Sequence, residues 1–189
     1  MLNRVILIGA STGGPGEIQK IIYSLPKLQN CAVIIAQHMA VEFLPSFVKR
    51  LQEHSLNKIY ITEDELPLKE GNIYFCNKIS EVFLKNSNLY FHVKLFEGAF
   101  SYNPAIDVIF NSFTPFCKDI EILSIILTGI GCDGIEGCNY LSLHGSRVIT
   151  QAQEDAIVDG MPARARESIK NIEVYKTEKI IEEIVRFCN

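Results

Sequence analysis

The sequence lacks the features that mark several large classes of protein. Its six cysteines are scattered without a Cys-x-x-Cys pair, and several lie in apolar stretches, where cysteine behaves as a small hydrophobic residue. We therefore expect reduced cysteines in a cytoplasmic protein. No set of His, Cys, Asp and Glu residues has the spacing of metal ligands, so we expect no metal and no cofactor.

Long apolar runs and an excess of positive charge are also absent. No apolar stretch approaches the length of a membrane-spanning helix, and the first residues lead into a short strand instead of a signal peptide. We therefore predict a soluble chain without direct membrane insertion. Lys+Arg 18 against Asp+Glu 22 give a net charge of -4, and no basic cluster is present, which argues against nucleic acid as a partner.

What the sequence does contain is a regular alternation of apolar strands and amphipathic helices. A chain of 189 residues suits one domain and can bury roughly 70% of the surface that its unfolded form exposes. We predict strands near 5–10, 31–36, 58–62, 122–128, 147–150 and 172–175, and helices near 18–25, 44–51, 103–113, 160–162 and 180–185. This order predicts a doubly wound α/β fold, with a mostly parallel sheet and helices on both faces.

The middle of the chain departs from this alternation. Short strands around 73–76, 82–84 and 89–93 are separated by polar turns, and we interpret this section as a β-hairpin insertion. After it, Asn103-Pro104 is expected to begin a helix, with a capping asparagine and a proline in the first turn. Because repeats, low-complexity segments and linkers are absent, we predict a single domain over 1–189.

The most informative segment is the end of the first strand. The apolar run from Val5 stops at Ser11, within Gly9-Ala10-Ser11-Thr12-Gly13-Gly14. Glycines tolerate a tight strand-to-helix turn, and the following helix begins with unpaired N–H groups. The segment therefore predicts an oxygen nucleophile at an electropositive, partly exposed edge, although Ser11 alone also suits a turn or a helix cap.

Two further chemically useful residues follow apolar strands. His38 comes after 31–37 and Asp133 follows the strand 122–128, and ligands and catalytic groups collect where such strand ends meet. Since a serine nucleophile needs a histidine base and a carboxylate that orients the base, we predict a Ser11, His38, Asp133 triad. Taken singly, the histidine also suits a backbone contact and the aspartate a helix cap. The other histidines, His54, His92 and His144, are explained as structural residues at helix ends or within a strand.

Two motif-based alternatives fit less well. Gly9-x-Ser11-x-Gly13 matches the nucleophile elbow of α/β-hydrolases, but those enzymes place the acid before the histidine along the chain. Gly9-x-Ser11-x-x-Gly14 also resembles a dinucleotide-binding turn, yet the second strand ends in Gln37-His38 instead of an acid for a ribose. Nucleotide binding therefore stays as the weaker alternative.

Five ordered motifs carry a family resemblance. The chain resembles the catalytic domain of bacterial chemotaxis receptor methylesterases, the CheB-type protein-glutamate methylesterases, over nearly its whole length. The motifs are 8–15 (Ile-Gly-Ala-Ser-Thr-Gly-Gly-Pro), 37–39 (Gln-His-Met), 104–110 (Pro-Ala-Ile-Asp-Val-Ile-Phe), 127–134 (Leu-Thr-Gly-Ile-Gly-Cys-Asp-Gly) and 158–162 (Val-Asp-Gly-Met-Pro).

The resemblance implies both an activity and the residues that carry it. Ser11 would attack a methylated glutamate on the cytoplasmic domain of a membrane chemoreceptor, with His38 as the base and Asp133 orienting the imidazole. Methanol would leave, water would hydrolyse the acyl-enzyme, and related enzymes also deamidate receptor glutamines. Thr12 and the Ile130 N–H would contribute to the oxyanion site.

The sequence also departs from the family pattern. Ile130 replaces the usual methionine, the stretch 75–80 replaces an Ala-Pro-Gly segment with a following histidine, and Ala105 stands where serine is usual. Because the first catalytic strand begins almost at Met1, no N-terminal receiver domain is expected. A catalytically silent scaffold that binds receptors, or the nucleotide-binding domain, is the alternative to an enzyme.

Overall fold

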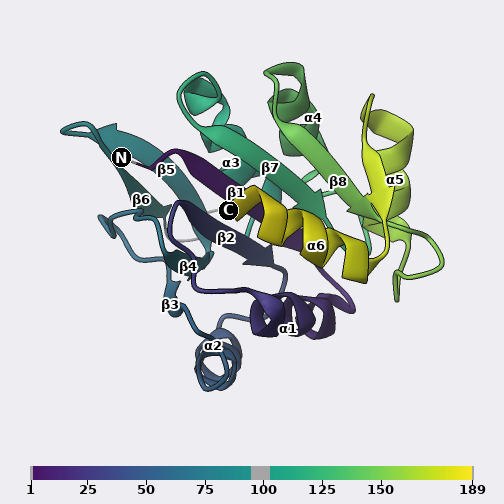
Figure 1. The fold of residues 1–189 in the computed structure, drawn as a ribbon, viewed down its shortest axis with the longest axis horizontal. Helices are drawn as coiled ribbons and strands as arrows, with labels where there is room; N and C mark the ends of the chain where they lie inside the picture. Colours follow the sequence, from purple (N-terminus) through teal and green to yellow (C-terminus); the bar gives the residue numbers. More distant parts are fainter. Residues whose placement is uncertain (1, 95–102, 189) are drawn as a thin grey trace.

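The computed structural model describes residues 2–94 and 103–188, and its centre is a seven-stranded sheet (Figure 1). All pairs of neighbouring strands in this sheet are parallel, which confirms the predicted fold class. In spatial order the strands are β3 (Lys58–Ile61), β4 (Asn72–Phe75), β2 (Cys31–Gln37), β1 (Arg4–Ala10), β7 (Glu121–Ile126), β8 (Arg147–Gln151) and β9 (Glu173–Tyr175).

The central strands are apolar because helices cover both of their faces. Every residue of β2 is buried, as are all residues of β1 after Arg4, and a strand buried on both sides has no reason to alternate polar and apolar residues. The strand order reverses at β1, which has β2 on one side and β7 on the other. In an open α/β sheet, such a reversal opens a crevice at the carboxyl ends of the strands.

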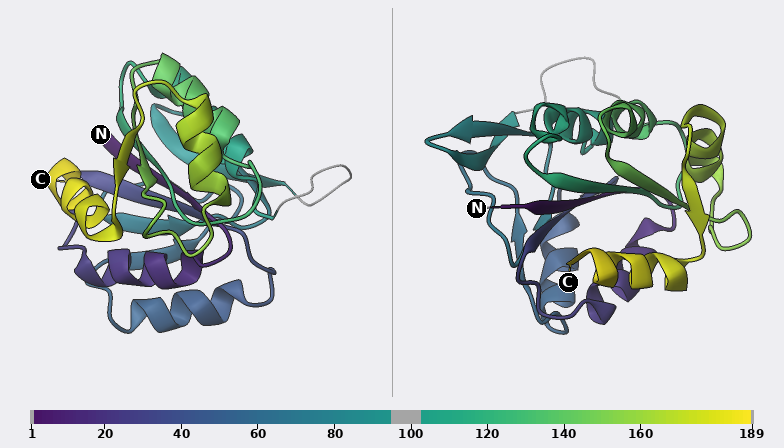
Figure 2. Two further views of the ribbon diagram at one scale, coloured as in Figure 1. Left: turned by 90° about the vertical axis from the view of Figure 1, so that its right-hand side faces the viewer. Right: turned by 45° about the horizontal axis from the view of Figure 1, so that its top comes forward.

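The helices form two layers, one on each face of the sheet (Figure 2). Isoleucines and leucines of β1 alternate between the two hydrophobic clusters, so that each face contributes to one of them. One layer consists of α1 (Gly14–Ser24), α2 (Leu44–Gln52) and α6 (Thr177–Cys188), and the other of α3 (Ile106–Ser112), α4 (Ile135–Leu143) and α5 (Gly160–Ser168), with the short 3-10 helix η1 (Thr114–Phe116) after α3. None of the helices in the described ranges is long and apolar enough to span a bilayer.

The hairpin insertion is smaller than the sequence suggests. Only β5 (Ile79–Lys85) and β6 (Asn88–Lys94) form the antiparallel pair, which packs beside α3, where the Val82 N–H donates to Ser112 Oγ (3.1 Å). The strand at 73–76, which we grouped with the hairpin, is β4 of the main sheet. It lies between β2 and β3 and is buried there, so grouping it with the hairpin was wrong.

The start of α3 also differs from expectation. The helix begins at Ile106, after Ala105, and neither Asn103 nor Pro104 forms its first turn. Asn103 does not cap the helix. The first N–H groups of α3 are instead satisfied by a carboxylate from the loop after β7, which removes the need for a local cap.

Candidate active site

Ser11 follows β1 directly and opens the turn into α1. Its N–H donates to the Thr128 carbonyl (3.0 Å), and its own carbonyl accepts the Gly14 N–H (2.9 Å). Gly13 has a φ of 86°, a left-handed conformation that glycine adopts without strain. A Cβ on Gly13 would also lie 2.8 Å from Ile157 Cβ. The turn is therefore fixed by main-chain bonds, and Ser11 is left half-buried at the edge of the sheet.

His38 occupies the equivalent position at the end of β2. Ala10 and Gln37 are register partners, and the His38 N–H donates to the Ala10 carbonyl (2.9 Å). Ser11 and His38 are thus the residues that directly follow the last register pair of β1 and β2. Neighbouring parallel strands lie about 4.8 Å apart. The imidazole side chain is 11% exposed.

Asp133 approaches the same imidazole from the loop after β7. Its Oδ2 lies 2.7 Å from His38 Nε2, and the carboxylate side chain is 5% exposed. A carboxylate only accepts hydrogen bonds, so Nε2 carries the hydrogen and Nδ1 is the basic nitrogen of the ring. The structure thus brings the three residues of the predicted triad to the reversal point of the strand order.

The carboxylate of Asp133 is held by the first turn of α3. Oδ2 also accepts the Ile106 N–H (2.8 Å), and Oδ1 accepts the Asp107 N–H (2.9 Å). Asp133 therefore caps a helix, as its local sequence suggests, but that helix is α3 and not α4, which follows it in the chain. The main-chain bonds fix the carboxylate that fixes the imidazole.

Asp107 is a half-buried acid near Asp133 to which sequence reasoning did not assign a role. Its Oδ1 accepts the Gly137 N–H in the first turn of α4 (2.8 Å). Burial, together with the negative charge of Asp133, raises the pKa of Asp107 to about 6. The signal in the sequence was an acid in the first turn of a helix, next to apolar residues.

Thr12 and Ile130 both belong to segments that lie next to Ser11. Thr12 is exposed in the turn after Ser11, while a Cβ on Gly129 would lie 2.7 Å from Ser11 Cβ, so the segment leading to Ile130 passes directly against the serine. Within the described part of the chain, the N–H groups of Thr12 and Ile130 donate to no other backbone carbonyl. Their assignment to the oxyanion site remains a prediction.

Two buried polar side chains support this edge and were missed as functional residues. Thr128 Oγ1 donates to the Thr12 carbonyl (2.9 Å) and accepts the Val158 N–H (2.8 Å). Gln37 Nε2 donates to the carbonyls of Ser11 (2.9 Å) and His38 (2.8 Å). Each is a polar residue at the end of an apolar run in the sequence. This contrast is the sequence feature that could have drawn attention to them.

The remaining histidines lie away from the triad. His54 packs edge-on against Tyr23, His92 of β6 bonds Asp64 (2.7 Å), and His144 bonds the Tyr140 carbonyl at the end of α4 (2.8 Å). Within residues 2–94 and 103–188, no group of three or more His, Cys, Asp and Glu side chains could hold a metal ion.

A serine at the end of one strand, with a histidine that is bonded by a buried carboxylate at the neighbouring strand end, has the residue types of a serine hydrolase site. The order Ser, His, Asp along the chain differs from that of the α/β-hydrolases. The fold is therefore that of a parallel α/β protein, and its candidate site carries the residue types of a serine hydrolase in a chain order that differs from that of the α/β-hydrolases.

Comparisons with known proteins agree with this class. The family model described as CheB methylesterase matches residues 6–184, and the chain belongs to this family. The crystal structure of the Thermotoga maritima CheB methylesterase catalytic domain superposes with a TM-score of 0.87 at 26% identity, covering 98% of this chain and 99% of that one.

Curated relatives carry a double name. "Protein-glutamate methylesterase/protein-glutamine glutaminase 4" of Hahella chejuensis is 35% identical over 161 residues, which are 84% of this chain and 41% of the relative. The Methanosarcina barkeri protein-glutamate methylesterase/protein-glutamine glutaminase is 31% identical over 195 residues, which are 100% of this chain and 53% of the relative. The chain thus spans about half the length of these relatives. The family resemblance is confirmed, and the comparisons favour it over the nucleotide-binding alternative.

Proposed function

We propose that the chain is a serine methylesterase that removes methyl esters from glutamate side chains of chemotaxis receptors and releases methanol. The observation that carries the proposal is the 2.7 Å bond from His38 Nε2 to the buried Asp133 carboxylate, with Ser11 at the adjacent strand end. The relatives are named protein-glutamate methylesterases, which supports the ester, and the receptor follows from the resemblance to chemotaxis receptor methylesterases.

In the first half of the reaction, His38 Nδ1 takes the Ser11 Oγ proton while Oγ attacks the ester carbonyl. Asp133 stabilises the imidazolium that forms. The N–H groups of Thr12 and Ile130 are proposed to bind the negative oxygen of the tetrahedral intermediate. Removal of one such donor typically costs roughly 10²- to 10³-fold in rate.

In the second half, the proton on Nδ1 passes to the methoxy oxygen, and methanol leaves. His38 then deprotonates a water molecule that attacks the acyl-enzyme, which returns the proton to Ser11 Oγ and releases the glutamate. A glutamine substrate would lose ammonia at the same step, so glutaminase activity requires no additional residue. No cofactor enters either half.

The surroundings of Ser11 suit a polypeptide substrate. Ile130, Ile157 and Phe43 are 63%, 66% and 66% exposed, and they come from the loops after β7, β8 and β2, at the edge that carries the triad. Exposed apolar side chains beside a reactive group favour a partner with its own apolar surface. We propose that this partner is the cytoplasmic domain of a methylated membrane chemoreceptor, and that the chain acts in the cytoplasm.

Methanol release from methylated chemoreceptor, measured with the purified chain at fixed salt and protein concentration, tests the proposal. Ser11→Ala should abolish release, while Ser24→Ala, at the exposed end of α1, should release methanol at the wild-type rate. Receptor binding without turnover would instead support the silent scaffold. Equal release by wild type and Ser11→Ala would contradict the assignment of the nucleophile.

A further inference from the structure

Gln37 is the last residue of β2 and is only 2% exposed. Its Nε2 donates one hydrogen bond to the Ser11 carbonyl (2.9 Å) and one to the His38 carbonyl (2.8 Å). An amide nitrogen carries two hydrogens, so both hydrogens of Nε2 are used. One binds the Ser11 carbonyl and the other the His38 carbonyl, and in the proposed mechanism the side chains of these two residues react with each other. β1, β2 and α1, which converge on this point, are neighbours in Figure 1.

These two bonds are additional to those that the fold already provides. The β1–β2 ladder and the bond from the His38 N–H to the Ala10 carbonyl join the two strands without Gln37. Gln37 Oε1, moreover, is buried without a hydrogen-bond partner in the described part of the chain. A buried, unpartnered amide oxygen destabilises the folded state and offsets part of what the two Nε2 bonds contribute.

From these contacts we infer that Gln37 is a positioning residue that sets the distance between the nucleophile and its base. Ser11 and His38 sit on different strands, and a small slide or rotation of one strand end would move Oγ away from Nδ1. The Gln37 amide joins the two main chains at the level of the reacting side chains. The inference rests on the proposed function, because it assigns Gln37 a role in activating Ser11.

Gly14 packs closely against the Gln37 amide. A Cβ on Gly14 would lie 2.0 Å from Gln37 Oε1 and 2.7 Å from Ala10 Cβ. Gly14 does not have a positive φ, so its backbone would accept alanine, and the obstacle is space. The glycine after the nucleophile turn therefore leaves room for the Gln37 side chain, which links two motifs that are far apart in the sequence.

The principal test is the reaction of Ser11 with a fluorophosphonate probe, in which Oγ displaces fluoride and no receptor is needed. Gln37→Met keeps an unbranched chain of similar length and removes both donors. We expect it to fold, and at a temperature well below its midpoint of unfolding to react about 10- to 100-fold more slowly, because misplacement by about 1 Å costs that much. The increase of the labelling rate with pH, which reports the imidazole base, should flatten as well.

A purely structural role predicts the opposite pattern, with a lower midpoint of unfolding and an unchanged labelling rate and pH profile in the folded variant. That result would overturn the inference. Wild-type protein that does not react with the probe would contradict the proposed function and the role of Gln37 together. Normal labelling without methanol release would instead contradict only the proposed substrate.

Gly14→Ala provides a second measurement that leaves Gln37 in the chain but displaces its amide. Gly16→Ala is the matched control in the same helical turn, because a Cβ there meets nothing within 4 Å. We expect Gly14→Ala to slow labelling and Gly16→Ala to leave it unchanged. In the Gln37→Met background, Gly14→Ala should slow labelling by a smaller factor than in the wild type. Full additivity of the two factors would count against the inference. Where Gln37→Met is too unstable to interpret, an unchanged labelling rate in folded Gly14→Ala would count against it instead.

Discussion

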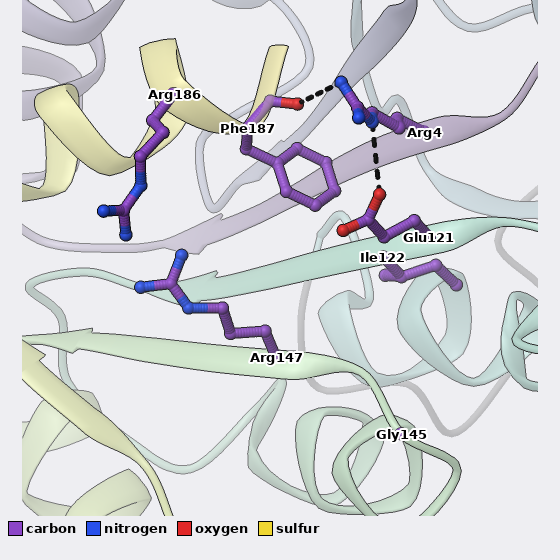
Figure 3. Close-up of a pocket in the computed structure, with 7 residues that line it drawn as sticks. All are labelled: Arg4, Glu121, Ile122, Gly145, Arg147, Arg186 and Phe187. Carbon is purple, nitrogen blue, oxygen red and sulfur yellow. Dashed lines mark hydrogen bonds and ion pairs between the residues drawn. The ribbon is translucent and has the colours of Figure 1, made fainter. Parts of the chain in front are cut away.

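The two edges of the central sheet both concentrate polar side chains, but they use them differently. At the carboxyl edge, Ser11 follows β1, His38 follows β2, and Asp133 lies in the loop after β7. Mostly main-chain groups hold these residues in place. At the amino edge, oppositely charged side chains bind one another. The amino edge also has a pocket of about 270 Å³ (Figure 3).

The charged groups of the amino edge come from the first residues of β1, β7 and β8, and from β9 and α6. Arg4 Nε lies 3.1 Å from Glu121. Arg147 makes bonds of 2.5 and 2.6 Å to Glu173 and of 2.7 Å to Glu183, which is 3% exposed. These arginines are therefore neutralised by neighbouring glutamates, although Figure 3 shows them around a cavity.

The comparison teaches that a cavity and charge do not by themselves identify a reactive site. At the amino edge the charged groups are satisfied by each other, so they stabilise the fold. At the carboxyl edge, main-chain N–H groups bind the Asp133 carboxylate, and main-chain bonds hold Ser11 and His38 at their strand ends. Variants at the two edges should therefore separate activity from stability.

Ser11→Ala should give the largest effect. Removal of a triad member commonly lowers kcat by about 10⁴-fold or more, and we expect such a loss in methanol release. Since the Ser11 turn is held by main-chain bonds, the midpoint of thermal unfolding should match that of the wild type. A loss of activity that parallels a loss of folded protein would refute this separation.

Asp133→Asn should lower kcat by about 10⁴-fold, because an amide in this position no longer selects the required tautomer of the histidine. The variant also weakens the cap on α3, so a modest loss of thermal stability is expected with it. Steady-state kinetics and calorimetry on the same preparation would check both effects. Retention of more than a tenth of the wild-type kcat would show that Asp133 does not orient His38.

Arg147→Met should affect stability and leave activity unchanged. It removes the bonds to Glu173 and one of three cations from the buried Glu183 carboxylate, which Lys179 and Arg186 still contact. We therefore expect a loss of about 1–3 kcal/mol, less than the cost of leaving a buried charge unpaired. The bond to Arg147 lowers the pKa of Glu173, so this contribution is present above the ordinary glutamate pKa and is lost as pH falls through the folded value. Denaturant unfolding of wild type and variant at pH 7 and pH 4 measures this pH-dependent contribution to the free energy of unfolding.

Arg164→Met is the matched control for that variant. Arg164 pairs with Glu167 on α5, and their side chains are 64% and 65% exposed. Exposed pairs contribute about 0–1 kcal/mol, so unfolding should hardly change. Equal losses in both variants would mean that burial of Glu183 does not matter.

Asp107→Asn should give a smaller effect than Arg147→Met, with the opposite dependence on pH. Because burial raises the pKa of Asp107 to about 6 from its ordinary value of 3.8, its favourable contribution is complete below 3.8 and is lost as pH rises through 6. Asparagine can still accept the Gly137 N–H. The variant should therefore gain about 1 kcal/mol of stability relative to the wild type between pH 4 and pH 8, after allowance for solvent screening. A difference that is constant with pH would exclude this account.

The sequence predicts those parts of the structure that depend on local patterns. Predominantly apolar runs identify β1, β2 and β7, and the helical periodicity of Ile18, Ile21 and Ile22 identifies α1. The positions of Ser11 and His38 then follow, because the carboxyl ends of parallel strands share an edge.

Features that depend on distant partners could not be predicted in this way. A four-residue strand such as β4 pairs where tertiary contacts allow, so its sequence does not distinguish the main sheet from the hairpin. The start of α3 is set by Asp133, which is 27 residues from Ile106. In the sequence, Gln37 is one polar residue at the end of an apolar strand, and its bond to Ser11 is seen only in the folded structure.

The bond from His38 to Asp133 joins residues that are 95 positions apart, and this separation has a consequence during synthesis. A nascent chain that has completed β1 and β2 already contains the nucleophile and the base, yet its imidazole has no carboxylate partner until β7 and the following loop leave the ribosome. The growing polypeptide should therefore be hydrolytically inert for most of its translation. Stalled chains of increasing length should acquire fluorophosphonate reactivity only after Asp133 has emerged.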